Sequence, residues 1–489
     1  MQRQIRKVGF GLVVAFMAVF FQLNYVQIFA AERIASNNAN VRSLLREYSI
    51  ARGDILTLDG TRVAVSEPTG DRLEYRRSYP GGALYGHITG YYSIRYGTSR
   101  IESAYNEQLL GDSGVISMQD IQDQFLGSGE EGDDVRLTIH SRLQEVARSA
   151  LGDNEGAVVA LDPQSGEVRA MWSNPSYDPT PLASHDGKEA KRYWESLNPD
   201  SPTGPLVSRV TSVGYPPGST AKVVTAAAAL ESKYEPDSVF PDPVELELPQ
   251  TDETLTNFTK TSCAGGQIDL RTALEVSCDT TFAMLGMEIP NEIRQMAEAI
   301  GFNEPIPFDV GTEPSNFPEV GEDAKPFQAY VGIGQGDVVA TPLQMALVAA
   351  TVANGGEVPR PQLVREVIDP SGGIVDRIQP ESLGTAMSSE TAREVTELME
   401  AVVHGDNGTG QAAQIPGVTV AGKTGTAQTV EGENPHVWFI AFAPVEDPQL
   451  AVAVIVESGG TVGSEATGGA VAAPIAKQVL EADRQIREW

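Results

Sequence analysis

The sequence predicts an α/β (α+β) fold in which an antiparallel five-stranded sheet is flanked by helices and joined to an all-helical lobe. Near one end of the main region, a hairpin is predicted within 156–172, with its turn at 162–166. Near the other end stand three runs rich in β-branched and aromatic residues, at 418–429, 436–443 and 450–457. Because the segment between them is mostly helical in pattern, both ends should contribute to one sheet and the middle should form a second lobe.

The N-terminus predicts a membrane anchor. Three basic residues within the first seven positions precede a mostly apolar run at 8–31, and a basic flank before such a run places the N-terminus in the cytoplasm. A cleavable signal peptide is the alternative, but Phe29-Ala30-Ala31 is not a clean cleavage pattern. We expect residues 1–33 to form a cytoplasmic tail and a single-pass signal anchor, with the rest of the chain outside the cell membrane.

Two further regions follow the anchor. Residues 34–134 contain no cluster of titratable residues that suggests chemistry, and Gly127-Ser128-Gly129 with the acidic run after it favours a linker. The main domain is expected over 135–489. It begins with a capping box, Ser141-x-x-Gln144, which predicts a helix start, and it closes with a helix over 470–486.

Composition argues against several functions. The net charge of −31 over 489 residues argues against nucleic-acid binding, for which a basic patch is the expected footprint. The five histidines show no metal-ligand spacing, and the chain has neither a Walker A nor a dinucleotide-binding fingerprint. We therefore expect no metal and no cofactor.

Ser219 and Lys222 form an S-x-x-K string at the start of an Ala-rich segment, 219–233, that lacks Gly and Pro and predicts a helix. Residues three apart share a helix face, and Ser219 would lie at the N-terminus, where developing negative charge is stabilised. If Lys222 is buried, desolvation lowers its pKa and makes it a base for the serine. The alternative is an N-cap serine followed by a solvated lysine.

Two more strings extend this pattern. Ser277-Cys278-Asp279 stands where an S-x-N string would, and Lys423-Thr424-Gly425-Thr426-Ala427 lies in a predicted strand. A lysine and two hydroxyls along a strand suit an anionic substrate group, and Gly425 permits close backbone approach. The alternative for the last string is an edge strand whose exposed lysine blocks edge pairing. In this order, the three strings describe a serine acyl-transfer site assembled from three parts of one fold.

The two cysteines, Cys263 and Cys278, predict a disulfide. An exported protein meets an oxidising compartment, where an even pair of cysteines is usually bridged. The bond would fix the second string, because Cys278 is its middle residue. The alternative is two buried thiols.

The three strings resemble the active-site motifs of the penicillin-binding proteins and serine β-lactamases. The resemblance extends from Ala51 to the C-terminus. Over this range the sequence is most similar to the class B penicillin-binding proteins, which are peptidoglycan D,D-transpeptidases. It implies a penicillin-binding transpeptidase / serine β-lactamase-like fold, with residues 34–134 as a non-catalytic pedestal. The other matching segments are Arg52-Gly53-Asp54-Ile55, Gly156–Trp172, Gly334-Gln335-Gly336, Thr341–Ala346, Gly408-Thr409-Gly410 and His436–Phe439.

The resemblance also implies a role for each motif residue. Ser219 would attack the penultimate carbonyl of a D-Ala-D-Ala stem peptide, Lys222 would be its base, and Ser277 would relay a proton to the leaving amine. β-Lactam antibiotics would acylate the same serine. The implied substrate-binding residues are Asp279, Lys423, Thr424, Gly425 and Thr426, with the backbone N–H groups of Ser219 and Thr426 as the oxyanion hole.

Asp279 departs from the Asn of the family's S-x-N motif. An ionised carboxylate near Lys222 would raise the pKa of the lysine and weaken it as a base. The alternative is a protonated Asp279 that mimics the Asn. The same site could serve a D,D-carboxypeptidase or a β-lactamase with water as acceptor, or a catalytically weak wall-binding scaffold or β-lactam sensor. Because the region before residue 135 lacks glycosyltransferase motifs, glycan polymerisation would come from a membrane-bound partner of the elongation or division machinery.

Overall fold

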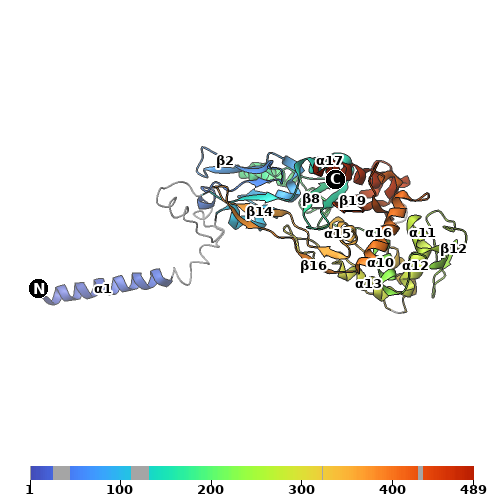
Figure 1. Cartoon of the computed structure of the whole chain (residues 1–489). Helices are drawn as coiled ribbons and strands as arrows, with labels where there is room; N and C mark the ends of the chain where they lie inside the picture. Colours follow the sequence, from blue (N-terminus) through green and yellow to red (C-terminus); the bar gives the residue numbers. More distant parts are fainter. Residues whose placement is uncertain (1, 26–44, 112–130, 322, 428–432) are drawn as a thin grey trace.

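The structure is a computed structural model, and it describes residues 2–25, 45–111, 131–321, 323–427 and 433–489 (Figure 1). Some parts of the predictions lie outside the described residues. They include 26–33 of the anchor region, 34–44 and 112–130 of the region expected at 34–134, with the linker glycine segment at 127–129, and the last two residues of the strand expected at 418–429.

The predicted five-stranded antiparallel sheet is present, with strand order β17-β18-β19-β7-β8. β19 pairs with β7, so the two ends of the main region meet within the sheet. The strand expected from residue 418 begins only at Ala421, because Ile415 and Val418 first pair in a tight bridge that turns the chain. The strands are β7 (Gly156–Leu161), β8 (Val168–Asn174), β17 (Ala421–Ala427), β18 (His436–Ala443) and β19 (Leu450–Val456).

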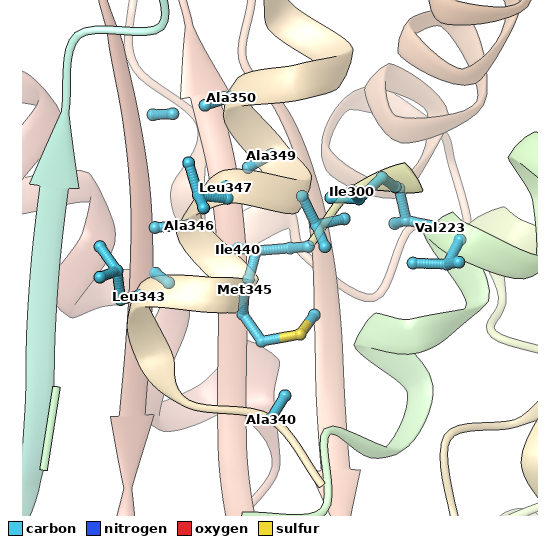
Figure 2. Packing of buried hydrophobic residues seen from close by; sticks show 14 of the residues in the cluster. Val223, Ile300, Ala340, Leu343, Met345, Ala346, Leu347, Ala349, Ala350 and Ile440 are labelled. Atoms are coloured by element: carbon cyan, nitrogen blue, oxygen red, sulfur yellow. The ribbon is translucent and has the colours of Figure 1, made fainter. Parts of the chain in front are cut away.

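Helices cover both faces of this sheet, which explains why every residue of β19 is buried. α8 (Ser141–Leu151) and α17 (Ala473–Arg487) pack on one face, in a cluster that includes Phe439. α15 (Pro342–Ala353) packs on the other face, where Figure 2 shows its side chains with Ile440 of the sheet. Neighbouring residues of β18 thus point to opposite faces, as strand geometry requires.

The start of α8 differs from the predicted capping box. His140 is the N-cap residue, and its side chain makes no capping hydrogen bond. Ser141 donates its hydroxyl to Asp59 instead. Gln144 is buried, where its side chain accepts the N–H of Met171 at 2.8 Å and donates to two backbone carbonyls. Because these distant partners satisfy both side chains, the local reciprocal bonds do not form.

The second lobe is mostly helical, but the expectation of an all-helical lobe is wrong in one part. Residues 239–269, here called the hairpin loop, form two small antiparallel pairs: β9 (Val239–Pro241) with β12 (Gln267–Asp269), and β10 (Glu245–Glu247) with β11 (Thr254–Thr256). Strands this short give almost no periodic signal in a sequence. The helices of the lobe are α10 (Lys222–Ser232), α11 (Leu270–Glu275), α12 (Asp279–Glu288), α13 (Pro290–Ala299), α14 (Lys325–Gly332) and α16 (Ser389–His404).

A six-stranded sheet joins the N-terminal region to the main domain, with order β15-β14-β6-β1-β2-β3. The acidic run is packed structure from residue 131 on rather than a free linker, since Asp133 is buried and the N–H of Gly132 donates to Ala51 O at 2.9 Å. The strands are β1 (Ile55–Leu56), β2 (Arg62–Pro68), β3 (Tyr75–Ser78) and β6 (Asp134–Leu137), joined by β14 (Val364–Ile368) and β15 (Ile374–Arg377) from much later in the chain.

Helix α1 (Gln2–Tyr25) contains the described part of the predicted anchor. Its large apolar side chains, such as Phe10, Phe16 and Phe21, are exposed. In the described part of the chain, no helix combines the length and the apolar content that crossing a membrane requires.

Candidate active site

Ser219 lies in a tight turn at the start of a helix, as predicted. Residues Gly218–Ala221 form a 3-10 turn, and α10 continues from Lys222. Side chains at positions i and i+3 of a 3-10 turn eclipse each other, so Ser219 and Lys222 face the same side. Gly218 enters the turn with φ of +52°, a left-handed conformation that favours glycine.

The loop Gly334-Gln335-Gly336 packs directly against this turn. The N–H of Gly218 donates to the carbonyl oxygen of Gly334 at 2.9 Å. A Cβ on Gly334, whose φ is +72°, would lie 2.2 Å from the carbonyl oxygen of Gly218. Only glycine allows this approach, so the loop fixes the position of the turn that carries Ser219.

Lys222 is fully buried and bonds the second string. Its Nζ donates to the carbonyl oxygen of Ser277 at 2.8 Å and to Asp279 Oδ1 at 2.7 Å. Burial lowers the pKa of Lys222, and the Asp279 carboxylate opposes that shift. The predicted approach of Asp279 to Lys222 is therefore confirmed, and the alternative of a solvated lysine after Ser219 is excluded.

Ser277 connects the two lysines of the site. Its Oγ accepts a hydrogen bond from Lys423 Nζ at 2.9 Å and lies 3.4 Å from Lys222 Nζ. Its backbone has φ of +61°, a left-handed conformation that costs a non-glycine residue about 1–2 kcal/mol. This conformation brings both the hydroxyl and the carbonyl oxygen of Ser277 to Lys222.

Lys423 is fully buried although β17 is an edge strand of the five-stranded sheet. The alternative of an exposed lysine that blocks edge pairing is therefore excluded. Besides Ser277, Nζ contacts the carbonyl oxygen of Thr424 at 3.0 Å. Burial and the nearby charge of Lys222 hold the pKa of Lys423 well below its ordinary value, against the opposing effect of Asp279.

The rest of the strand string adjoins the turn of Ser219. A Cβ on Gly425 would lie 2.9 Å from the carbonyl oxygen of Pro217, so the strand and the turn are in direct backbone contact. The hydroxyls of Thr424 and Thr409 share a hydrogen bond of 2.7 Å. Thr426 is partly exposed, at the end of the string that lies beside Gly218.

Cys263 and Cys278 form a disulfide, with Cα atoms 6.0 Å apart, which confirms the prediction. The bond ties the hairpin loop to the middle of the second string. Asp242 accepts the N–H of Cys263 at 2.8 Å and completes the one group of potential metal-ligand side chains found among the described residues. Because the two sulfurs are bonded to each other, the group offers no thiolate to a metal.

Comparison with protein families identifies the fold that carries this site. The profile of the penicillin-binding protein transpeptidase domain matches residues 156–481. The chain is a penicillin-binding protein of the transpeptidase family. All three strings lie within the matched range. A second profile, that of the penicillin-binding protein A dimerisation domain, matches residues 52–135.

Relatives match over nearly the whole chain. The chain is 38% identical to the peptidoglycan D,D-transpeptidase PbpA of Mycolicibacterium smegmatis and 36% identical to that of Mycobacterium tuberculosis, with 99% of both chains covered in each case. The structure matches penicillin-binding protein A from M. tuberculosis, solved as a ceftriaxone acyl-enzyme complex, with TM-score 0.85 and 37% identity, over 90% of this chain and 99% of that one. The resemblance to class B penicillin-binding proteins is confirmed, and these comparisons extend it to the actinobacterial penicillin-binding protein A.

Sequence reasoning missed two residues that hold the site together. Thr409 bonds the hydroxyl of Thr424, and its only signal was the resemblance of the segment around it. Asn257 accepts the N–H of Asp279 at 2.8 Å, and a single asparagine in a loop carries no pattern that identifies such a role.

Proposed function

We propose that the chain is a peptidoglycan D,D-transpeptidase that cross-links stem peptides through an acyl-enzyme on Ser219, and that β-lactams inhibit it by acylating the same serine. The observation that carries the proposal is the convergence of Ser219, Lys222, Ser277 and Lys423 from separate parts of the chain into one site. The PbpA relatives are D,D-transpeptidases, and penicillin-binding protein A from M. tuberculosis forms an acyl-enzyme with ceftriaxone.

In the acylation step, Ser219 Oγ attacks the carbonyl carbon of the penultimate D-alanine. Lys222 takes the hydroxyl proton, for which it must be neutral, and its burial favours the neutral form. The backbone N–H groups of Ser219 and Thr426 stabilise the oxyanion, and each such donor contributes about 3–4 kcal/mol in other enzymes. The carbon–nitrogen bond then breaks, and the terminal D-alanine leaves once its nitrogen has received a proton through Ser277.

Lys423, Thr424 and Thr426 bind the terminal carboxylate of the donor peptide. β17 is the last strand of its sheet, so the donor can lie along its free edge as an additional strand. The incoming carboxylate favours the charged form of Lys423, which burial otherwise disfavours.

In the second step, the amino group of a neighbouring stem peptide attacks the ester carbonyl. The bond between the carbonyl carbon and Ser219 Oγ then breaks, Ser219 Oγ receives the proton of the amine through Lys222, and the new amide is the cross-link. Water in place of the amine would release a shortened stem peptide, which is the carboxypeptidase reaction.

Intact-mass measurement with a penicillin tests the nucleophile. We expect one adduct on the purified chain, its loss in Ser219→Ala, and its retention in Ser371→Ala, which removes an exposed hydroxyl. An adduct that persists in Ser219→Ala overturns the assignment. Incubation with a D-Ala-D-Ala peptide and an amine acceptor then separates the activities: an amide product supports transpeptidation, hydrolysis alone indicates a carboxypeptidase, and acylation without turnover indicates a scaffold or sensor.

We also propose that the apolar run at 8–31, of which α1 contains the described part, anchors the chain in the cell membrane with the catalytic domain outside, beside a membrane-bound glycan polymerase that supplies the strands. The support is the basic residues before the apolar run, together with the exposed apolar side chains of α1. Protease added to intact spheroplasts should digest the catalytic domain and spare a cytoplasmic marker protein. A soluble product with a new N-terminus near Ala31 would indicate a cleaved signal peptide instead.

A further inference from the structure

Asn257 is a buried residue of the hairpin loop that has no part in the reaction proposed above. The residue is 4% exposed. Its Oδ1 accepts two backbone hydrogen bonds, from the N–H of Asp279 at 2.8 Å and from the N–H of Thr280 at 3.1 Å. These are the first two residues of α12, whose N–H groups have no partner within the helix. The N-cap residue, Cys278, provides no side-chain cap, so Asn257 caps the helix from outside it.

The other side of Asn257 is fixed to its own loop. Its Nδ2 donates to the carbonyl oxygen of Thr261 at 3.0 Å, and its own carbonyl oxygen accepts the N–H of Lys260 at 2.8 Å. Cys263, two residues after Thr261, forms the disulfide with Cys278. The loop therefore holds the second string at two adjacent points, by the disulfide and by the amide of Asn257.

We infer that Asn257 is a positioning residue that holds the first turn of α12, and with it the Asp279 carboxylate, against Lys222. The geometry leads to this in two steps. The bonds from Oδ1 fix the backbone of Asp279, and from that position Asp279 Oδ1 reaches Lys222 Nζ at 2.7 Å. Ser277, two residues earlier, is held with φ of +61° and bonds the same lysine through its carbonyl oxygen.

This role has a consequence for the protonation of the base. Among the described residues, Asp279 from α12 is the charged group that raises the pKa of Lys222. Lys423 from β17 is also buried nearby, and the charge of Lys222 lowers the pKa of Lys423. Without the amide of Asn257, the Asp279 carboxylate is no longer held at contact distance, and its pKa-raising effect on Lys222 weakens. Because the base works in its neutral form, the rising part of the acylation rate profile then moves to lower pH. Ser277 also loses its fixed position, which lowers the maximal rate.

The test is the acylation rate by a penicillin as a function of pH in the full chain. Asn257→Ala should lower the plateau rate about ten-fold, which corresponds to losing a cap of ordinary strength, and should move the rising limb to lower pH. Asn257→Asp keeps the acceptor oxygen, so it should keep most of the plateau rate and show no downward shift of the limb. Asn354→Ala is the matched control, because Asn354 also donates to a backbone carbonyl, that of Glu357 at 3.1 Å, at the far end of α15.

Repeating the substitution in an Asp279→Asn variant distinguishes a role of Asn257 in positioning Asp279 from a role in stabilising the fold. In Asp279→Asn, the substitution Asn257→Ala should lower the plateau but leave the limb in place, since the charge that it displaces is already gone. The inference is overturned by an unchanged limb in Asn257→Ala, by a downward shift in Asn257→Asp, or by a shift that persists in the Asp279→Asn background. It rests on the proposed acyl transfer at Ser219, yet it fails separately: persistent labelling of Ser219→Ala refutes the proposed function, whereas an unshifted profile in Asn257→Ala refutes only the role of Asn257.

Discussion

Lys222 Nζ and Asp279 Oδ1 lie 2.7 Å apart, with the lysine side chain fully buried and the aspartate side chain 19% exposed. The two features of this pair have opposite effects on the base. Burial favours the neutral lysine that can take a proton from Ser219, whereas the carboxylate favours the charged lysine that cannot. The pH at which the enzyme acylates therefore depends on the residue at position 279.

Asp279→Asn should speed acylation near neutral pH. The substitution removes the charge that raises the pKa of Lys222, so the neutral base forms at lower pH and the rising limb of the rate profile moves downward. An asparagine oxygen can still accept the bond from Lys222, which preserves the geometry. The measurement is the acylation rate against pH for both proteins. Slower acylation of the variant at every pH would give the carboxylate a positive catalytic role and contradict this account.

Gly334→Ala should cut the acylation rate by about a hundred-fold, the scale expected when a catalytic group is displaced by about 1 Å. The added Cβ would lie 2.2 Å from the carbonyl oxygen of Gly218 and push the turn of Ser219 out of place. Gly372→Ala is the control, because Gly372 is also left-handed, with φ of +89°, but a Cβ there meets open space. Stopped-flow acylation measures the rates, and equal rates in the two variants would mean that the loop does not position the serine.

Reduction of the disulfide between Cys263 and Cys278 should lower the free energy of unfolding by about 3 kcal/mol, which the chain-entropy model gives for a closed loop of this size. The two cysteines are 15 positions apart in the sequence. Urea unfolding with and without reductant measures the change. Peptide mapping under non-reducing conditions should recover one linked pair of peptides, and two freely alkylated thiols in the native exported protein would refute the bond.

Glu102→Gln should destabilise the N-terminal region by about 3–5 kcal/mol, because it leaves buried guanidinium groups uncompensated. Glu102 is fully buried and bonds Arg52 and Arg77 at 2.6 Å each. Urea unfolding at neutral pH measures the loss, while the acylation rate of the folded fraction should stay unchanged. A loss similar to that of the exposed control Glu67→Gln, whose carboxylate faces Arg76 at the surface, would contradict the prediction.

The same residue should make stability pH-dependent. Burial alone raises the pKa of Glu102, but Arg77 and Arg52 outweigh it and hold the pKa below its ordinary value. The stabilisation is therefore complete above the unfolded pKa of about 4.3 and is lost as the pH falls through the lower folded value. Urea unfolding from pH 7 to pH 3 should show a loss that is smaller in Glu102→Gln than in the wild type. Parallel curves for the two proteins would exclude this contribution.

The active-site strings could be predicted because their chemistry requires particular residues at short, fixed spacing. Ser219 and Lys222 lie on one turn, and Lys423 lies in a predicted strand, β17, where it is buried although the strand is at the sheet edge. The disulfide followed from the number of cysteines and the compartment. Each of these features leaves a local mark in the sequence.

Other features depend on partners far away in the chain, and such partners leave no local mark. The capping box at Ser141 and Gln144 failed because both side chains bond residues of other elements. In the sequence, Asn257 does not differ from other polar loop residues. Its role is visible only from its hydrogen bond with the N–H of Asp279, at the start of α12. The pairing of β6 with β14 joins residues more than two hundred positions apart, and nothing in the hydrophobic pattern of either strand specifies the other.

The central place of β6 in the six-stranded sheet has a mechanical consequence. β6 is hydrogen-bonded to β1 of the N-terminal region on one side and to β14 of the catalytic domain on the other. The two parts therefore meet through a continuous ladder of backbone bonds rather than through a flexible joint. A pull on the N-terminal region is carried as shear along these strands, and the backbone bonds between β1 and β6 must break before one part can turn relative to the other. If the N-terminal region is fixed in one orientation, the catalytic domain, and with it the side on which Ser219 lies, is fixed as well.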